Sequence, residues 1–140
     1  LGSLQAQIEI LVESWEWRED DVILHCLPLH HVHGIVNALL CCLQAGGRVD
    51  LLRGFDPEIL WRRFVAGDIT VFMGVPTMYA RLTRAWEEGG DSLQEIRSEA
   101  CSKLRLMVSG SAALSVALLE AWEELSGQVL LERYGMTEIG

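Results

Sequence analysis

The chain has 140 residues, half of them hydrophobic, which is enough for one domain with a substantial core. Its formal net charge of −9 argues against a surface for nucleic acid or an anionic membrane. No run of about 20 uninterrupted apolar residues predicts a transmembrane segment, so we expect an acidic, soluble protein.

The first third of the chain predicts two helices and two strands. Residues 1–17 place Leu4, Ile8 and Leu11 on one helical face, together with Val12 and Trp15. The apolar run DVILHCLPL predicts a buried strand. GIVNALLCCLQAGG then has helix length and ends on two glycines, and RVDLL predicts the second strand.

The middle third predicts a strand between helices. Asp56-Pro57 is an N-cap followed by proline at the first helical position. ITVFMGV predicts the third strand, and Pro76-Thr77 opens the helix after it. Ser92-x-x-Glu95 has the spacing of a capping box for the next helix.

The last third completes the alternation. LRLMVSG predicts a fourth strand, Ser115 and Gly127 bound a helix, and QVLLERYG predicts a fifth strand. Strands that alternate with helices indicate an α/β fold, with a mostly parallel sheet and flanking helices. No repeats or low-complexity segments interrupt it.

The cysteines do not form a recognisable metal or redox motif. Cys26, Cys41, Cys42 and Cys101 lack C-x-x-C spacing, and the nearby histidines lack the spacing of zinc ligands. We interpret them as reduced core thiols of an intracellular protein.

Three segments that follow predicted strands carry candidate chemistry: LPLHHVHG, MVSGSAAL and ERYGMTEIG. Open α/β sheets bind ligands at the carboxyl ends of their strands. Each segment alone also has a plain explanation: histidines in the core or at the surface, a glycine turn before a helix, and Thr137 as an N-cap. Their order and spacing in one chain favour a single site.

The final segment suggests a phosphate site. Gly135 permits a tight turn, and Thr137 and Glu138 place a hydroxyl and a carboxylate beside it. Such groups can hold a phosphate and its Mg²⁺. We therefore expect this segment to lie in the middle of an active site and the chain to be part of a longer protein.

Taken together, YGMTE, VSGSAAL, PLHHVHG and MGVPTMY resemble the acyl-CoA synthetase branch of the adenylate-forming enzymes over essentially the whole chain. Within that branch, HVHG, VSGSA and LERYGMTE are most similar to the malonyl-CoA synthetase group. The resemblance implies a fold in which this chain is the central slice of a large N-terminal domain. It also implies ATP, Mg²⁺ and coenzyme A, with malonate or methylmalonate as the acid.

The resemblance assigns roles to particular residues. The nucleotide-binding set is Gly110, Ser111, Ala112, Glu132, Arg133, Tyr134, Gly135, Met136 and Thr137. The substrate-binding set is His31, His33, Ser109, Val75, Pro76, Thr77 and Arg105. The resemblance implies that Thr137, Glu138 and His31 take part in catalysis, with Glu138 holding Mg²⁺. Tyr134 would stack on adenine against the small residues 110–112.

Arg105 is the candidate determinant of the acid. It lies in the apolar strand segment KLRLMVS, where an unpaired guanidinium would be costly. A malonate enzyme needs a cation for the second carboxylate, and arginine offers a bidentate fork. The alternatives are a structural salt bridge or exposure at a sheet edge.

The family's phosphate loop, ribose-binding aspartate and C-terminal domain with its catalytic lysine are absent from this sequence, so the 140 residues alone are expected to be inactive. The favoured interpretation is part of an ATP-dependent acid–CoA ligase of the mitochondrial matrix, with the cytoplasm as the alternative. The alternatives in function are a medium-chain acyl-CoA synthetase or another adenylating enzyme, and a non-enzymatic α/β binding module.

Overall fold

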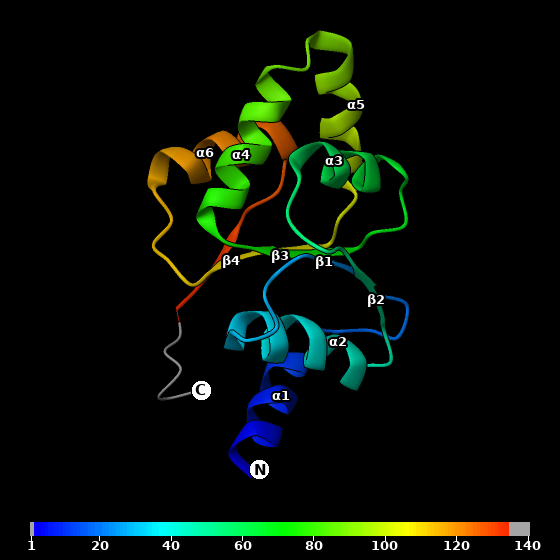
Figure 1. Ribbon diagram of the computed structural model, residues 1–140, viewed down its shortest axis with the longest axis vertical. Helices are drawn as coiled ribbons and strands as arrows, with labels where there is room; N and C mark the ends of the chain where they lie inside the picture. Colours follow the sequence, from blue (N-terminus) through cyan, green and yellow to red (C-terminus); the bar gives the residue numbers. More distant parts are fainter. Residues whose placement is uncertain (1, 135–140) are drawn as a thin grey trace.

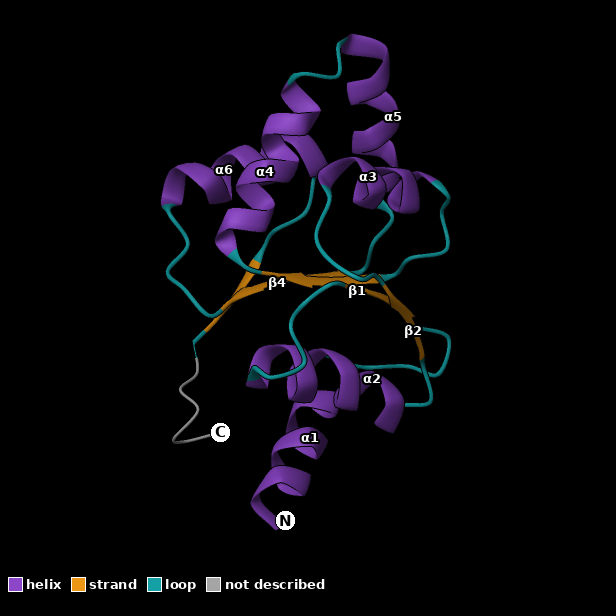
Figure 2. Cartoon of the chain, viewed as in Figure 1, coloured by secondary structure: helices purple, strands orange, loops and turns teal. Residues whose placement is uncertain are grey.

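The computed structural model describes residues 2–134 as a parallel sheet between two layers of helices (Figures 1 and 2). The sheet has five strands in the order β2-β1-β3-β4-β5, and every strand pair is parallel. This confirms the α/β fold with flanking helices that the sequence pattern predicts.

One helical layer is built from the N-terminal part of the chain. α1 covers Gly2–Ser14, η1 covers His33–Leu40 and α2 continues from it over Cys41–Gln44. These helices lie below the sheet in Figure 1. The strands that bracket η1 and α2 are β1, Val22–His25, and β2, Arg48–Leu51.

The other layer is built from the remaining helices, which lie above the sheet in Figure 1. They are α3 (Pro57–Val65), α4 (Pro76–Glu87), α5 (Asp91–Ser102) and α6 (Val116–Ser126). The strands between them are β3 (Val71–Gly74), β4 (Leu106–Gly110) and β5 (Leu131–Arg133).

Local capping chemistry explains most of the helix boundaries. The Asp56 carboxylate accepts a hydrogen bond from the Ile59 amide, and Ser115 caps α6 through the Leu118 amide. Gly127 ends α6 in the left-handed conformation. The predicted capping box at Ser92 is wrong, because α5 already begins at Asp91 and has no side-chain cap.

The two faces of the sheet have separate cores because strand residues alternate between them. The core beneath α3–α6 is aromatic: Trp61 stacks on Trp122 with ring centroids 6.1 Å apart. There the buried Tyr79 hydroxyl donates to the carbonyl of Val108 over 2.8 Å. The core against α1, η1 and α2 contains Ile23, Met73 and Val108.

The connections change face between β1 and β3. β1 leads to β2 through η1 and α2 below the sheet, whereas the later connections run above it (Figure 1). Neighbouring strands whose connections leave on opposite faces form a topological switch point, where open α/β sheets bind ligands. The fold therefore directs attention to the carboxyl ends of β1 and β3.

The four cysteines are buried and free of disulfides. Burial raises the pKa of Cys26 and Cys42 to about 11 and of Cys41 and Cys101 to about 12. These thiols are therefore protonated and unreactive at neutral pH. None of the described helices is long and apolar enough to cross a membrane.

Candidate active site at the carboxyl edge of the sheet

The strand register brings the predicted site segments to one edge of the sheet. Gly74 is paired with Ser109, Ser109 with Glu132, and Gly110 with Arg133. Because all five strands are parallel, the segments after β1, β3, β4 and β5 leave the sheet at this same carboxyl edge.

His33, in the helical layer below the sheet, contacts the ends of two strands at this edge. Its buried Nε2 donates to the Gly74 carbonyl over 3.2 Å, and its Nδ1 lies 3.3 Å from Nδ2 of Asn37. A Cβ atom added to Gly110 would lie only 2.8 Å from Cε1 of His33, so glycine is required there. The imidazole thus touches the last residue of β3 and the last residue of β4.

His33 is held in its neutral form. Burial lowers its pKa to about 4, helped by the nearby positive charge of Arg133 and partly opposed by the hydrogen bond to Gly74. Both ring nitrogens are engaged by protein groups, so the structure presents His33 as a support of the edge. Its predicted role as a substrate ligand remains a prediction.

The turn after β4 carries backbone strain. Ser111 has a φ of 69°, in the left-handed region that non-glycine residues rarely adopt. Strain of this kind is concentrated at ligand sites, where the surrounding structure maintains it. A carboxylate oxygen of Glu132 accepts from the Leu114 amide over 3.3 Å, which links this turn to β5.

The end of β5 and the residue after it present two of the predicted nucleotide-binding side chains in different ways. Arg133 is partly buried, and burial lowers the pKa of its guanidinium. Tyr134 is 84% exposed, so its ring is available for stacking. Ala112, in the turn opposite, is exposed as well.

The switch point is bordered by the segments after β1 and β3. His31 is exposed and its ring centroid lies 4.2 Å from that of His30. Val75 is the extended N-cap of α4, Pro76 occupies the first turn, and Thr77 is exposed beside it. The structure therefore places His31 and residues 75–77 at the position that the fold favours for a ligand.

Ser109 is fully buried, and its hydroxyl has no hydrogen-bond partner among residues 2–134. It follows Met107, which belongs to the core beneath α3–α6, at the two-residue spacing of one strand face. Its predicted substrate contact is not visible in the described part of the chain.

Arg105 corrects the sequence-based prediction. It precedes β4, at the amino edge of the sheet, and its guanidinium pairs in a bidentate fashion with Asp21, donating through Nε over 2.7 Å. A further guanidinium nitrogen donates to the Trp15 carbonyl over 3.0 Å. The prediction that it binds a distal carboxylate of the substrate is wrong, and the structural salt bridge is observed instead.

Asp21 explains why this arginine tolerates its apolar strand. Burial alone would raise the pKa of Asp21, but hydrogen bonds from Arg105, Thr70 and the Arg18 amide outweigh it and lower that pKa. The residues are 84 positions apart in the chain, so no sequence spacing revealed the pair.

Sequence reasoning also missed Asn37 and His25, which are buried on the same side of the sheet as His33. The position of Asn37 four residues after His33 is a signal that helical periodicity could have supplied. Gly135, Met136, Thr137 and Glu138 lie outside the described residues.

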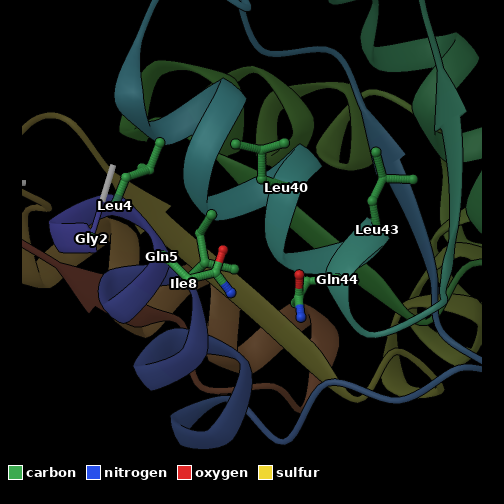
Figure 3. Close-up of a pocket in the computed structure, with 7 residues that line it drawn as sticks. All are labelled: Gly2, Leu4, Gln5, Ile8, Leu40, Leu43 and Gln44. Carbon is green, nitrogen blue, oxygen red and sulfur yellow. The ribbon is translucent and has the colours of Figure 1, made fainter.

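A surface cavity of about 670 Å³ lies elsewhere, between α1 and the η1–α2 segment. Figure 3 shows its lining residues, which are Gly2, Leu4, Gln5, Ile8, Leu40, Leu43 and Gln44. None of them belongs to the predicted site, and the lining offers no ionisable side chain. We therefore assign the candidate site to the carboxyl edge of the sheet.

Comparisons with known proteins identify the family of the chain. Residues 2–140 match the family model described as AMP-binding enzyme. The chain is 47% identical over 147 residues to the mitochondrial malonate–CoA ligase ACSF3 of Homo sapiens, covering 99% of the chain and 25% of that protein. It is 45% identical to the malonate–CoA ligase of Arabidopsis thaliana, covering 98% of the chain and 24% of that protein.

Solved structures show the same relationship. A malonyl-CoA ligase in a ternary product complex with methylmalonyl-CoA and AMP matches with a TM-score of 0.86 and 38% identity. The match covers 97% of this chain and 28% of that one. ATP-bound MatB from Rhodopseudomonas palustris matches with a TM-score of 0.84 and 36% identity, over 97% of this chain and 25% of that one. The chain thus spans about a quarter of the relatives it matches, and it belongs to the AMP-binding enzyme family.

Proposed function

We propose that this chain contributes the central part of the adenylation domain of an ATP-dependent acid–CoA ligase. The observation that carries the proposal is the strained turn at Ser111, beside the exposed ring of Tyr134, in a chain of the AMP-binding family. In the reaction, a carboxylate attacks the α-phosphate of ATP to give an acyl-adenylate and pyrophosphate. The thiol of coenzyme A then attacks the acyl carbon and displaces AMP.

The described residues support a nucleotide at one side of the site. Tyr134 would stack on the adenine, and the small residues 110–112 would let the backbone approach its other face. Glu132 holds the turn through the Leu114 amide, and Arg133 adds positive charge near it. His31 and residues 75–77 would border the acid and the passage for coenzyme A.

Mg²⁺ belongs to the proposal on the basis of the motif. Bound to the phosphates, it would neutralise part of the negative charge that opposes attack by an anion. Its candidate ligand Glu138 lies outside the described residues, and residues 2–134 bring together no group of three or more His, Cys, Asp or Glu side chains. Oxygen ligands such as a carboxylate and a threonine hydroxyl suit this ion.

We propose malonate or methylmalonate as the acid. A relative by sequence is named a malonate–CoA ligase, and a similar solved structure is named a malonyl-CoA ligase. Since Arg105 is paired with Asp21, we propose that another cation receives the second carboxylate. Arg81 fits by position: it lies one turn after Thr77 on α4, and its guanidinium is 4.8 Å from the ring centroid of Phe55, in the segment after β2. That places it over the carboxyl edge.

We also propose a mitochondrial location for the whole protein, because vertebrate relatives are named as mitochondrial enzymes. The cytoplasm is the alternative. The partial-domain organisation is likewise a proposal, supported by the quarter of the relatives' length that the chain spans.

The test uses the full-length protein. Malonate should support ATP–pyrophosphate exchange and formation of a CoA thioester, and octanoate should do so poorly. Glu138→Gln should lower the exchange rate at least about 100-fold, as expected for one lost electrostatic contact in the transition state. Exchange with octanoate but not with malonate would favour a medium-chain enzyme. If neither acid supported exchange, a binding module would be favoured.

A further inference from the structure

The tautomer of His33 follows from its contacts. Nε2 faces the Gly74 carbonyl, which can only accept a hydrogen bond, so Nε2 must carry the proton. Burial keeps the ring neutral, so Nδ1 is an acceptor. Asn37 must therefore present its amide NH₂ group to Nδ1, which leaves its Oδ1 buried without a partner among residues 2–134.

The contact between His33 and Asn37 lies within a single irregular helix. His33 and Asn37 lie four residues apart on η1, a π-helical segment of the kind that often occurs at functional sites. Gly34 allows this segment to approach the loop after β1, because a Cβ atom there would lie 2.2 Å from the Pro28 carbonyl oxygen. The ring is thereby pressed against Gly110, the residue that begins the strained turn.

We propose that Asn37 is a positioning residue for the nucleotide site. By donating to Nδ1 it fixes the His33 ring so that Nε2 binds Gly74 and the ring edge supports Gly110. Loss of that donor leaves the buried acceptor Nδ1 unpaired. The His33 ring can then rotate, and it no longer supports the backbone at residues 110–112. The inference rests on the nucleotide-binding role proposed above for this turn.

The first experiment measures AMP affinity by calorimetry in the full-length protein. Asn37→Leu should weaken AMP binding about 10-fold, as expected when one buried acceptor loses its donor. His25→Leu is the matched control: it is equally buried on the same side of the sheet, and its ring nitrogens have no partners among the described residues. It should leave AMP affinity unchanged.

The second variant, Asn37→Asp, keeps the side-chain volume but replaces the donor with an acceptor. Two titratable groups among residues 2–134 face His33, namely His25 from β1 and Arg133 from β5, and both disfavour its protonation. A carboxylate at position 37 opposes them, so His33 should become protonated as the pH falls and donate to both neighbours. In this variant AMP affinity should be about 10-fold weaker than in the wild type at pH 8, and it should recover at pH 6.

Normal AMP affinity in both Asn37 variants would overturn the inference, as would an equal loss in His25→Leu or no recovery of Asn37→Asp at pH 6. A full-length protein that shows these AMP effects but activates no acid would overturn the proposed function and leave the inference intact.

Discussion

The two edges of the sheet differ in how their carboxylate and hydroxyl groups are paired. At the amino edge, Asp21 receives hydrogen bonds from Arg105, Thr70 and the Arg18 amide. At the carboxyl edge, the hydroxyl of Ser109 has no partner among residues 2–134, and Ser111 is strained. Paired polar groups stabilise a fold, and backbone strain is concentrated at ligand sites, so we interpret the amino edge as structural and the carboxyl edge as the ligand side.

The largest expected effect tests the structural assignment of the amino edge. Arg105→Ala in the full-length protein should lower the free energy of unfolding by about 3–5 kcal/mol, because it leaves the buried Asp21 carboxylate without its cation. Arg105 is 23% exposed, so the lower end of that range is expected. Denaturant unfolding measures the change.

The matched control is Arg48→Ala, which removes an exposed ion pair with Asp68 and should cost less than about 1 kcal/mol. The ratio of kcat/KM for malonate to that for butyrate should not change in Arg105→Ala. A selective loss of malonate activity with normal stability would restore Arg105 as a substrate ligand.

The Arg105 result shows what the sequence could and could not predict. Local signals sufficed for the strands and for the caps at Asp56 and Ser115, because periodicity and capping depend on neighbouring residues. The partner of Arg105 depends on how distant segments meet. The strand pattern showed that the guanidinium needed a partner but held no information on which one, or on which edge of the sheet it would lie.

The candidate site also has features that the sequence could predict and features that it could not. Motif order placed His31, residues 75–77 and residues 110–112 at one edge, and parallel strands require that they meet there. The contact of His33 with Gly110 and the conformation of Ser111 could not be predicted, because both follow from packing between separate elements.

The second prediction moves the search for the substrate cation to the carboxyl edge. Arg81→Ala should lower the malonate-to-butyrate ratio of kcat/KM about 30-fold, corresponding to about 2 kcal/mol for a lost charge pair. Arg84→Ala is the control, since Arg84 is exposed on the same helix and pairs with Glu88. Steady-state kinetics with both acids measure the ratio. An unchanged ratio in Arg81→Ala would exclude this residue as the determinant.

The third prediction uses the acid dependence of stability to test the amino edge. The pKa of Asp21 is lowered from 3.8, so its contribution is fully present above about pH 4 and is lost as the pH falls through the folded-state value. The contribution to the slope of stability is at most about 1.4 kcal/mol per pH unit for one proton. Asp21→Asn should abolish this part of the slope. An identical acid dependence in wild type and Asp21→Asn would contradict the assignment.

The smallest expected effect separates strain from stability at the carboxyl edge. Ser111→Gly should raise the free energy of unfolding by about 0.5–1 kcal/mol, because glycine adopts a positive φ without the steric cost that serine carries. Ser111→Ala keeps that cost and should show no gain in stability, which makes it the control for the lost hydroxyl.

If the strained turn is maintained for the nucleotide, AMP affinity should fall in Ser111→Gly although the protein is more stable, because the freed backbone must be ordered again on binding. Thermal unfolding and calorimetric AMP binding measure the two quantities. A loss of stability in Ser111→Gly would mean that the turn is a structural element like the Asp21–Arg105 pair, and the contrast between the two edges would fail at this residue.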